Sequence, residues 1–237
     1  MSRRRWIADE YSDQHAALVG ANAEHLAVVL RVRAGQAFEI VTGERLRIGR
    51  VISVSPERVE FELGEEIQAS ALPNISLVMA VYKFDRMEWA IEKCTELGVA
   101  RIIPVIARRT DSHLARAAVT RVDRWQRIVR QASEQSRRTA TPAVDDPIKI
   151  SAAVKLTAAR RILLAETERQ ITLKEALQDY SVGDELLLAL GPEGGWSEDE
   201  LALFSQCGWV AATLGTTILR AETAAIAATA IAFAELS

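Results

Sequence analysis

Cysteine and histidine are scarce in this 237-residue sequence, and their scarcity argues against several kinds of site. The two cysteines, Cys94 and Cys207, are far apart and lack C-x-x-C spacing, which argues against a zinc site and against a disulfide scaffold. The three histidines, His15, His25 and His113, form no metal-binding or catalytic-triad pattern. We therefore expect no bound metal.

Long apolar runs are also missing. No uncharged apolar run approaches the length of about 18 residues that a transmembrane helix requires, so we expect no membrane association. The opening MSRRRWIADEYSD is basic but has no apolar stretch like that of a secretory signal. We therefore expect a cytoplasmic protein. Hydrophobic residues make up 49% and charged residues 26%, which is ordinary for a globular protein with a core of normal size.

The chain as a whole has no excess of positive charge, although one segment of it does. The net charge is -3, so the chain as a whole is not a basic nucleic-acid-binding protein. Between Arg101 and Arg138, however, there are ten arginines and three acids, and between Glu166 and Glu200 there are ten acids and two bases. Patches of opposite sign can steer a charged partner, although two solvated helix faces would give the same pattern.

The first 70 residues have the pattern of a small, mostly β domain. Three short runs alternate or end at turn residues and predict strands: AFEIV (37–41), LRIGRVISV (46–54) and RVEFEL (58–63). The preceding NAEHLAVVLRV predicts a short helix that starts at Asn22. The segment ASALPN (69–74) is a plausible linker, so we expect one domain over residues 1–70 and a second over residues 75–237.

From residue 75 the pattern changes to alternating strands and helices. ISLVMAVY (75–82) is a continuous apolar run, typical of a strand that is covered on both faces. Later runs of the same kind are RIIPVI, RILLAE, ELLLAL and WVAATL, with helical patterns between them. Repeated β-α units predict a mostly parallel sheet with helices on both faces. Trp89 and Trp125 fit core positions of two of these helices.

The stretch LALGPEGGWSEDEL (188–201) joins a strand to a helix through glycine and proline. Gly194 and Gly195 can adopt positive φ and expose backbone amides, and Pro192 stiffens the entry. Ser197 and Glu200 have the spacing of a capping box at the start of the helix. A tight turn would use the same residues, but the loop follows the carboxyl end of a strand, where parallel sheets bind ligands.

A second stretch, LGTTILRAETAA (214–225), also runs from a strand end through glycine into a helix. Arg220 and Glu222 flank the start of that helix. They could pair with each other, or Glu222 could complement the positive end of the helix dipole. Two loops of this kind so close in sequence favour a ligand site over two coincidental turns.

Together these two stretches resemble the C-terminal signature of the bacterial 16S ribosomal RNA uridine-N3 methyltransferases, a family of the SPOUT superfamily. RMEWAIEKCTELGV (86–99), RQASEQSRRTATPAV (130–144) and HLAVVLRVRAGQAFEI (25–40) resemble further segments of that family in the same order. The resemblance therefore covers almost the whole chain. Thr216 and Thr217 depart from it, because the family usually has a proline and a basic residue there.

The resemblance implies a fold and a cofactor. The fold would be an α/β domain with a trefoil-knotted, mostly parallel sheet, preceded by a small PUA-like β-barrel that binds RNA. The cofactor would be S-adenosylmethionine, held bent among three loops. Carried over to this sequence, its binding residues would be Leu164, Ala165, Glu166, Leu190, Gly191, Pro192, Glu193, Gly194, Gly195, Leu214, Gly215, Ile218, Leu219, Arg220, Thr223 and Ala224.

The resemblance also implies methyl transfer to N3 of a uridine in 16S ribosomal RNA of the small subunit, by a homodimer. We hypothesise two catalytic residues: Arg220 would stabilise negative charge on the uracil oxygens, and Glu222 would accept the N3 proton or orient Arg220. Positive side chains would contact RNA phosphates, with Gln135 and Arg138 nearest the target base. The proposed RNA-binding residues are Arg5, Arg31, Arg33, Arg108, Arg109, Gln135 and Arg138.

Two alternatives stay open at the level of sequence. A non-catalytic RNA-binding or ribosome-assembly factor could keep the same fold, and Thr216 and Thr217 favour that alternative most. A SPOUT methyltransferase that acts on another RNA would have the same motifs. Binding of S-adenosylmethionine separates the first alternative from an enzyme, and the identity of the methylated nucleotide separates the second.

Overall fold

The computed structural model describes residues 5–43, 45–67, 72–136, 138–178 and 183–236. The chain divides into two compact units, one formed by residues 1–71 and 133–140 and the other by residues 72–132 and 141–237. Residues 133–140 group with the first unit, although the sequence pattern put them in the second domain. Residues 68–70, at the expected end of the first domain, lie outside the described residues. No described helix combines the length and hydropathy that crossing a bilayer requires.

The first unit is built on a six-stranded sheet in the order β1-β4-β5-β6-β3-β2. The first pair, β1 with β4, is parallel, and the other neighbours are antiparallel. Leu18, Ile40 and Phe61 are fully buried in its core. The strands are β1 (Arg5–Ile7), β2 (Glu10–Tyr11), β3 (His15–Val19), β4 (Ala37–Thr42), β5 (Arg45–Val54) and β6 (Arg58–Ile67). The three strands predicted from the alternating pattern correspond to β4, β5 and β6.

The expected helix near Asn22 is present but irregular. Helix α1 (Gly20–Glu24) continues directly into a short π-helix, η1 (His25–Val29). Arg31 follows with a φ of 51°, in the left-handed region that non-glycine residues rarely adopt. The strands β1, β2 and β3, which precede this helix, were not predicted, because they span only two to five residues and carry little alternation.

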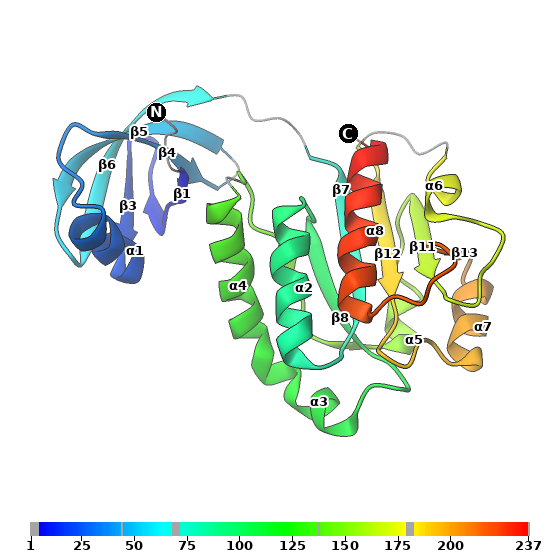
Figure 1. Ribbon diagram of the computed structural model, residues 1–237. Helices are drawn as coiled ribbons and strands as arrows, with labels where there is room; N and C mark the ends of the chain where they lie inside the picture. The colour runs from blue at the N-terminus through cyan, green and yellow to red at the C-terminus, as the bar shows by residue number, and fades with distance from the viewer. Residues whose placement is uncertain (1–4, 44, 68–71, 137, 179–182, 237) are drawn as a thin grey trace. The chain divides into compact units, whose positions relative to one another are not determined.

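The second unit contains the predicted parallel sheet (Figure 1). The strand order is β10-β8-β7-β12-β11-β13, with β9 paired to β8, and every pairing is parallel. The strands are β7 (Asn74–Ala80), β8 (Arg101–Ile106), β9 (Ala143–Val144), β10 (Ile148–Lys149), β11 (Arg160–Leu164), β12 (Glu185–Leu190) and β13 (Val210–Ala212). Parallel strands need long crossover connections, and these connections supply the helices.

Helices cover both faces of this sheet, as the alternation of strands and helices predicted. On one face α2, α4, α6 and α8 pack over Leu77 and Met79, with α2 beside α8. On the other face α5 and α7 pack over Val78 and Ala80. The helices are α2 (Phe84–Glu96), α3 (Ser112–Ala117), η2 (Val119–Arg121), α4 (Val122–Gln135), α5 (Ile150–Ala153), α6 (Leu173–Ala176), α7 (Glu198–Gln206) and α8 (Ala221–Leu236). The trefoil knot and the PUA-like barrel stay predictions.

The two tryptophans that fit core positions have different environments. Trp125 is fully buried in α4, as expected. Trp89 is 48% exposed, so its assignment to the core was wrong. The buried face of α2 passes through Met87, Ala90 and Cys94, and position 89 falls outside that face. Burial also raises the pKa of the Cys94 thiol to about 12, which disfavours the reactive thiolate.

The capping box predicted from Ser197 and Glu200 is present, and α6 begins with a second one. Thr172 and Glu175 cap α6, and Ser197 and Glu200 cap α7, each through reciprocal side-chain to backbone hydrogen bonds. The box on α7 has an additional contact, because Glu200 is 3% exposed and its Oε1 also accepts the Arg108 backbone N–H at 2.7 Å. Glu200 therefore links the start of α7 to the segment after β8.

This extra contact predicts unequal effects of two similar substitutions. Glu200→Ala removes a cap and leaves the Arg108 N–H without its acceptor, which should lower the free energy of unfolding by about 2 kcal/mol. Glu175→Ala removes only an exposed cap and should cost clearly less. Urea denaturation followed by circular dichroism measures both values. Equal losses for the two variants would show that the link from Glu200 to Arg108 contributes nothing.

Candidate active site

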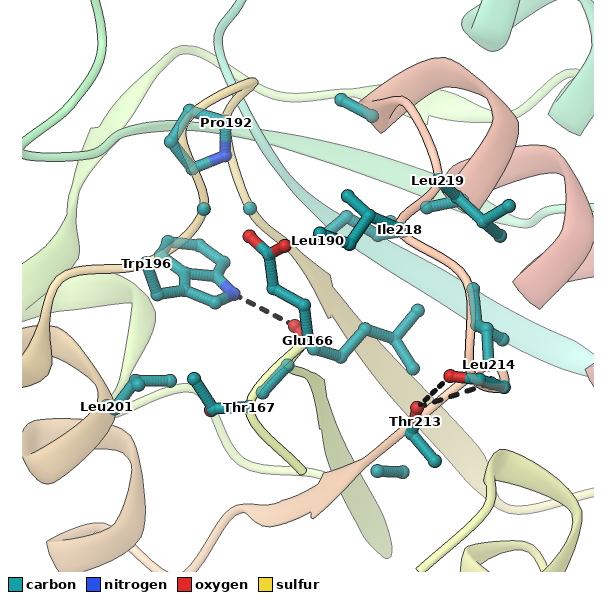
Figure 2. A pocket seen from close by; sticks show the side chains of 18 of the residues that line it. Glu166, Thr167, Leu190, Pro192, Trp196, Leu201, Thr213, Leu214, Ile218 and Leu219 are labelled. Atoms are coloured by element: carbon teal, nitrogen blue, oxygen red, sulfur yellow. Dashed lines mark hydrogen bonds between the residues drawn. The ribbon is translucent and has the colours of Figure 1, made fainter. Parts of the chain in front are cut away.

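A cavity of about 620 Å³ lies at the carboxyl ends of β11, β12 and β13, in the second unit. Its volume is within the range of about 300–1,000 Å³ that small-molecule sites occupy. Figure 2 shows part of its walls, in which apolar side chains lie around the projecting carboxylate of Glu166. Three segments distant in sequence build these walls: 164–169 after β11, 190–198 after β12, and 212–224 between β13 and α8.

Most of the residues that the sequence assigned to a cofactor line this cavity. The structure brings together Leu164, Ala165, Glu166, Leu190, Gly191, Pro192, Glu193, Gly195, Leu214, Gly215, Ile218, Leu219 and Ala224. They converge because β11 and β12 are neighbours and β13 pairs with β11, so the three strands end at the same edge of the sheet. This edge is where parallel sheets bind their ligands.

Three assigned residues do not line the cavity. Gly194 is turned away from it, and a Cβ at this position would lie 3.3 Å from Cδ of Arg109. Arg220 is exposed on the rim, between Leu219 and Ala221, which both line the wall. Thr223 is exposed on the first turn of α8, one position before Ala224. The assignment failed at these positions because it treated whole loops as walls, whereas only one side of each loop faces the cavity.

Gly195 makes the closest approach between two walls. It has a φ of 69°, and a Cβ on it would lie 2.5 Å from Oε1 of Glu166, closer than real Cβ atoms approach another atom. The expectation of positive φ therefore holds for Gly195, whereas Gly194 does not share that conformation. The positive φ favours glycine at position 195, where the loop after β12 lies against the Glu166 side chain.

Trp196 was not identified from the sequence, although it follows the glycine pair directly. It is 7% exposed and lines the cavity, and its Nε1 donates to the Leu164 carbonyl at 3.2 Å (Figure 2). Its ring packs against Phe204 of α7 with the ring centroids 5.0 Å apart. A Cβ on Gly191 would lie 3.2 Å from Nε1 of Trp196, so this glycine leaves room for the indole. Trp196 thus joins the first two walls.

Thr213 fixes the start of the third wall. Its Oγ1 accepts the Gly215 N–H at 3.2 Å and donates to the Gly215 carbonyl at 3.0 Å (Figure 2). Its backbone N–H donates to the Ile171 carbonyl at 2.8 Å. The loop is therefore restrained just before Thr216 and Thr217, although the proline usual in the resembled family is missing. Further lining residues that sequence reasoning missed are Thr167, Arg169, Glu198, Leu201, Ala212 and Ala221.

Arg109, which the sequence assigned to RNA, contacts the loop after β12, and Arg108 beside it pairs with α7. Arg109 lines the cavity, and its Nη1 donates to the carbonyl of Gly194 and, at 3.4 Å, to that of Trp196. The Arg108 guanidinium pairs with Asp199 of α7. These contacts are explained by the sheet, because the segment after β8 ends at the same edge as the loop after β12. A run of arginines in sequence did not reveal them.

The other residues assigned to RNA differ in accessibility. Arg31, Arg33 and Gln135 are exposed. Arg5 is only 16% exposed in its side chain and pairs with Glu39 at 3.0 Å. Arg138 is 7% exposed, and burial lowers the pKa of its guanidinium to about 10, which still leaves it charged at neutral pH. The structure therefore buries a side chain that the sequence placed against the target base.

The two assigned catalytic residues lie beside the cavity and do not pair with each other. Glu222 is 5% exposed, and its Oε2 has no hydrogen-bond partner among the described residues. Its Oε1 lies 3.9 Å from Nε of Arg86, in the first turn of α2. The Arg220 guanidinium forms no salt bridge within the described ranges. Arg86 thus takes the position of the cation that the sequence had suggested for Arg220.

Within the described residues, no three histidine, cysteine, aspartate or glutamate side chains gather into a metal site. The cavity is lined by glycine-rich backbone and by apolar side chains, with a few charged side chains among them. Such a site suits an organic ligand that has both an apolar ring and polar or charged groups.

Comparison with known proteins gives this cavity a context. Residues 69–233 match the model of a family described as RNA methyltransferase domain, which places the chain in that class of enzymes. The sequence is 33% identical to ribosomal RNA small subunit methyltransferase E of Mycobacterium bovis, over 90% of this chain and 84% of the relative. It is 32% identical to the protein of that name from Synechocystis sp., over 87% of this chain and 69% of the relative.

Solved structures have the same fold. Ribosomal RNA small subunit methyltransferase E from Neisseria gonorrhoeae, bound to S-adenosyl methionine, gives a TM-score of 0.84 at 31% identity, over 97% of this chain and 96% of that one. Lpg2936, a putative methyltransferase from Legionella pneumophila in complex with the same cofactor, gives 0.85 at 27% identity, over 99% and 98%. The chain belongs to the ribosomal RNA small subunit methyltransferase E family.

The geometry of Gly195 predicts that alanine is less well tolerated there than at Gly194, which serves as the matched control. Gly195→Ala forces a Cβ against Glu166 at positive φ, so it should lower the free energy of unfolding by about 1–2 kcal/mol. Gly194→Ala places its Cβ at 3.3 Å from a flexible arginine stem without positive φ and should cost clearly less. Chemical denaturation of both variants measures the difference. Equal stability of the two would contradict the close approach.

Proposed function

We propose that this protein transfers the methyl group of S-adenosylmethionine to N3 of a uridine in 16S ribosomal RNA of the small ribosomal subunit. The observation that carries the proposal is the cavity, built by glycine-bearing loops at three parallel strand ends. The relatives named for small-subunit ribosomal RNA methylation, and the solved relative that holds S-adenosyl methionine, support it.

The residues present fit this cofactor. Leu190, Leu214, Ile218 and Leu219 provide an apolar wall suited to a planar adenine (Figure 2). Glycine positions let the backbone approach the ligand closely, as Gly195 already approaches Glu166. The Glu166 carboxylate projects into the cavity, and a carboxylate favours the positively charged groups of the cofactor. Shape, polarity and charge therefore agree.

When bound, S-adenosylmethionine supplies an electrophilic methyl group on a positively charged sulfur. The residues of the chain must then expose the target base and take up the charge that develops on it. Arg220, exposed on the rim beside Leu219, is positioned to donate to uracil oxygens that gain negative charge when the N3 proton leaves. Glu222 has a buried oxygen without a partner in the described chain, which keeps it a candidate for accepting that proton.

Binding of the RNA would use exposed cations of both units. Arg31 and Arg33 are exposed in the first unit, and Gln135 is exposed at the end of α4. In the second unit Arg124 and Arg127 are exposed on α4. Phosphate contacts of this kind orient an RNA without reading its sequence. Because ribosomal RNA is the substrate, we place the enzyme in the cytoplasm.

We also propose that the protein acts as a homodimer. Trp89 is 48% exposed on α2, and α8 beside it has partly exposed apolar side chains at Ile226 and Ile231. Small residues such as Ala227 on α8 would allow a second helix to approach closely. An exposed aromatic next to an apolar helix favours contact with another protein surface. Sedimentation equilibrium of the purified protein tests this assignment.

The function itself is tested by methyl transfer to small ribosomal subunits from cells that lack the corresponding gene. We expect the protein and S-adenosylmethionine to produce 3-methyluridine in the 16S ribosomal RNA, identified by nuclease digestion and mass spectrometry. Absence of cofactor binding at millimolar concentration would favour a non-catalytic ribosome-assembly factor. Methylation of a different RNA alone would move the protein to another substrate.

The placement of Glu166 predicts charge-dependent cofactor affinity. S-adenosylmethionine carries one more positive charge than S-adenosylhomocysteine, so Glu166→Gln should weaken the former about threefold more than the latter at low salt. Glu185→Gln, at the opposite end of β12, is the matched control and should change neither affinity. Titration calorimetry measures both ligands. If both ligands lost affinity equally, Glu166 would pair with the ammonium group that they share. If neither lost affinity, Glu166 would not contact the cofactor.

Arg220→Ala should lower the rate of methyl transfer at saturating substrates by about 100-fold, because one donor to the developing charge is lost. Affinity for S-adenosylmethionine should change little, since the Arg220 side chain does not line the cavity. Single-turnover kinetics and calorimetry separate the two effects. A large loss of cofactor affinity with an unchanged rate at saturation would show that Arg220 binds the cofactor and does not act on the developing charge.

A further inference from the structure

Arg86, in the first turn of α2, lies between two carboxylates that come from different walls of the cavity. Its Nη1 donates to Oε1 of Glu193 at 2.8 Å, and its Nε lies 3.9 Å from Oε1 of Glu222. Glu193 belongs to the loop after β12 and lines the cavity. Glu222 begins α8 directly after Ala221, which also lines the cavity. Arg86 itself is not a wall residue.

The two carboxylates differ in their surroundings. The Glu193 side chain is 37% exposed, whereas that of Glu222 is 6% exposed. A buried carboxylate is costly unless a cation or hydrogen-bond donors compensate it. Arg86 is the cation in ion-pair contact with Glu222 among the described residues, and Oε2 of Glu222 accepts no hydrogen bond from them. The position of Glu222 therefore depends on Arg86 more than that of Glu193 does.

Tyr82, just after the end of β7, lies near the same two carboxylates. Its side chain is 2% exposed, and its pKa is raised first by burial and then by the negative charge of Cys94, Glu222 and Glu193. The end of β7, the start of α2, the loop after β12 and the start of α8 thus meet at a cluster with two acids and one arginine. Removing that arginine leaves the acids facing each other without compensation.

We propose that Arg86 is a positioning residue for methyl transfer, a role that rests on the function proposed above. By pairing with both carboxylates, it fixes the loop after β12 relative to the start of α8. These two segments carry the second and third walls of the cofactor cavity. The planar guanidinium of arginine, with several donors in fixed directions, suits this bridging role better than an ammonium group does.

The proposal predicts a loss in both binding and rate for Arg86→Ala. The dissociation constants of S-adenosylmethionine and S-adenosylhomocysteine should both rise about tenfold, because the walls are displaced whichever ligand is bound. The rate at saturating cofactor should fall as well, because Glu222 is no longer held in place. Arg86→Lys should recover part of the affinity but not the rate.

A double-mutant cycle separates this role from general damage. Glu193→Gln removes the negative charge from the shorter contact, so Arg86→Ala in that background should cost clearly less cofactor affinity than it does alone. Because Arg86→Ala leaves a buried charge uncompensated, the variant could unfold, and Arg86→Ala with Glu222→Gln removes that charge. The double variant should regain the wild-type melting temperature without regaining cofactor affinity.

Arg101→Ala is the matched control. Arg101 pairs with Asp145 at 2.6 Å with comparable exposure, but it begins β8, at the sheet edge opposite the cavity. Its loss should leave cofactor affinity unchanged. Wild-type affinity in Arg86→Ala, or strict additivity with Glu193→Gln, would overturn the positioning role. Failure of the wild-type protein to bind either ligand would instead reject the proposed function, so the two failures are distinguishable.

Discussion

The parallel pairing of β11, β12 and β13 is the constraint on which the site depends. Each parallel strand must be followed by a crossover, so consecutive loops emerge at one edge of the sheet and their first residues converge. At this edge the loop after β12 lies against the segment after β11 at Gly195, whose positive φ favours glycine.

Around this contact, polar side chains link the loops without filling the cavity. Trp196 joins the loop after β12 to the end of β11, and Thr213 restrains the loop after β13. Arg109 donates to the carbonyls of Gly194 and Trp196 from the side of β8. Each of these bonds ends on backbone. The walls are therefore fixed in the absence of ligand, and a bound cofactor loses less free energy to ordering them.

The arginine-rich region between Arg101 and Arg138 shows that charge along a sequence does not by itself reveal the role of each side chain. Its density suggested a surface for RNA, but the Arg109 guanidinium bonds to the loop after β12 and Arg138 is buried. Charge is a property of the residue, whereas the role of a long flexible side chain depends on what the fold brings within its reach. The same limit explains why Arg86, unremarked in its helix, becomes the partner of two distant acids.

The sequence by itself indicated the α/β class of the second unit, the main strands and the capping box on α7, through local periodicity, turn residues and motif spacing that act over a few neighbouring positions. Most of the residues that line the cavity were indicated by the resemblance to a known family. Only the tertiary structure decided which side of each loop faces the cavity, that Glu222 lies beside Arg86, and that Trp89 is exposed. Those outcomes depend on the order of strands in the sheet, which joins residues separated by a hundred positions or more in the chain, such as Arg86 and Glu193.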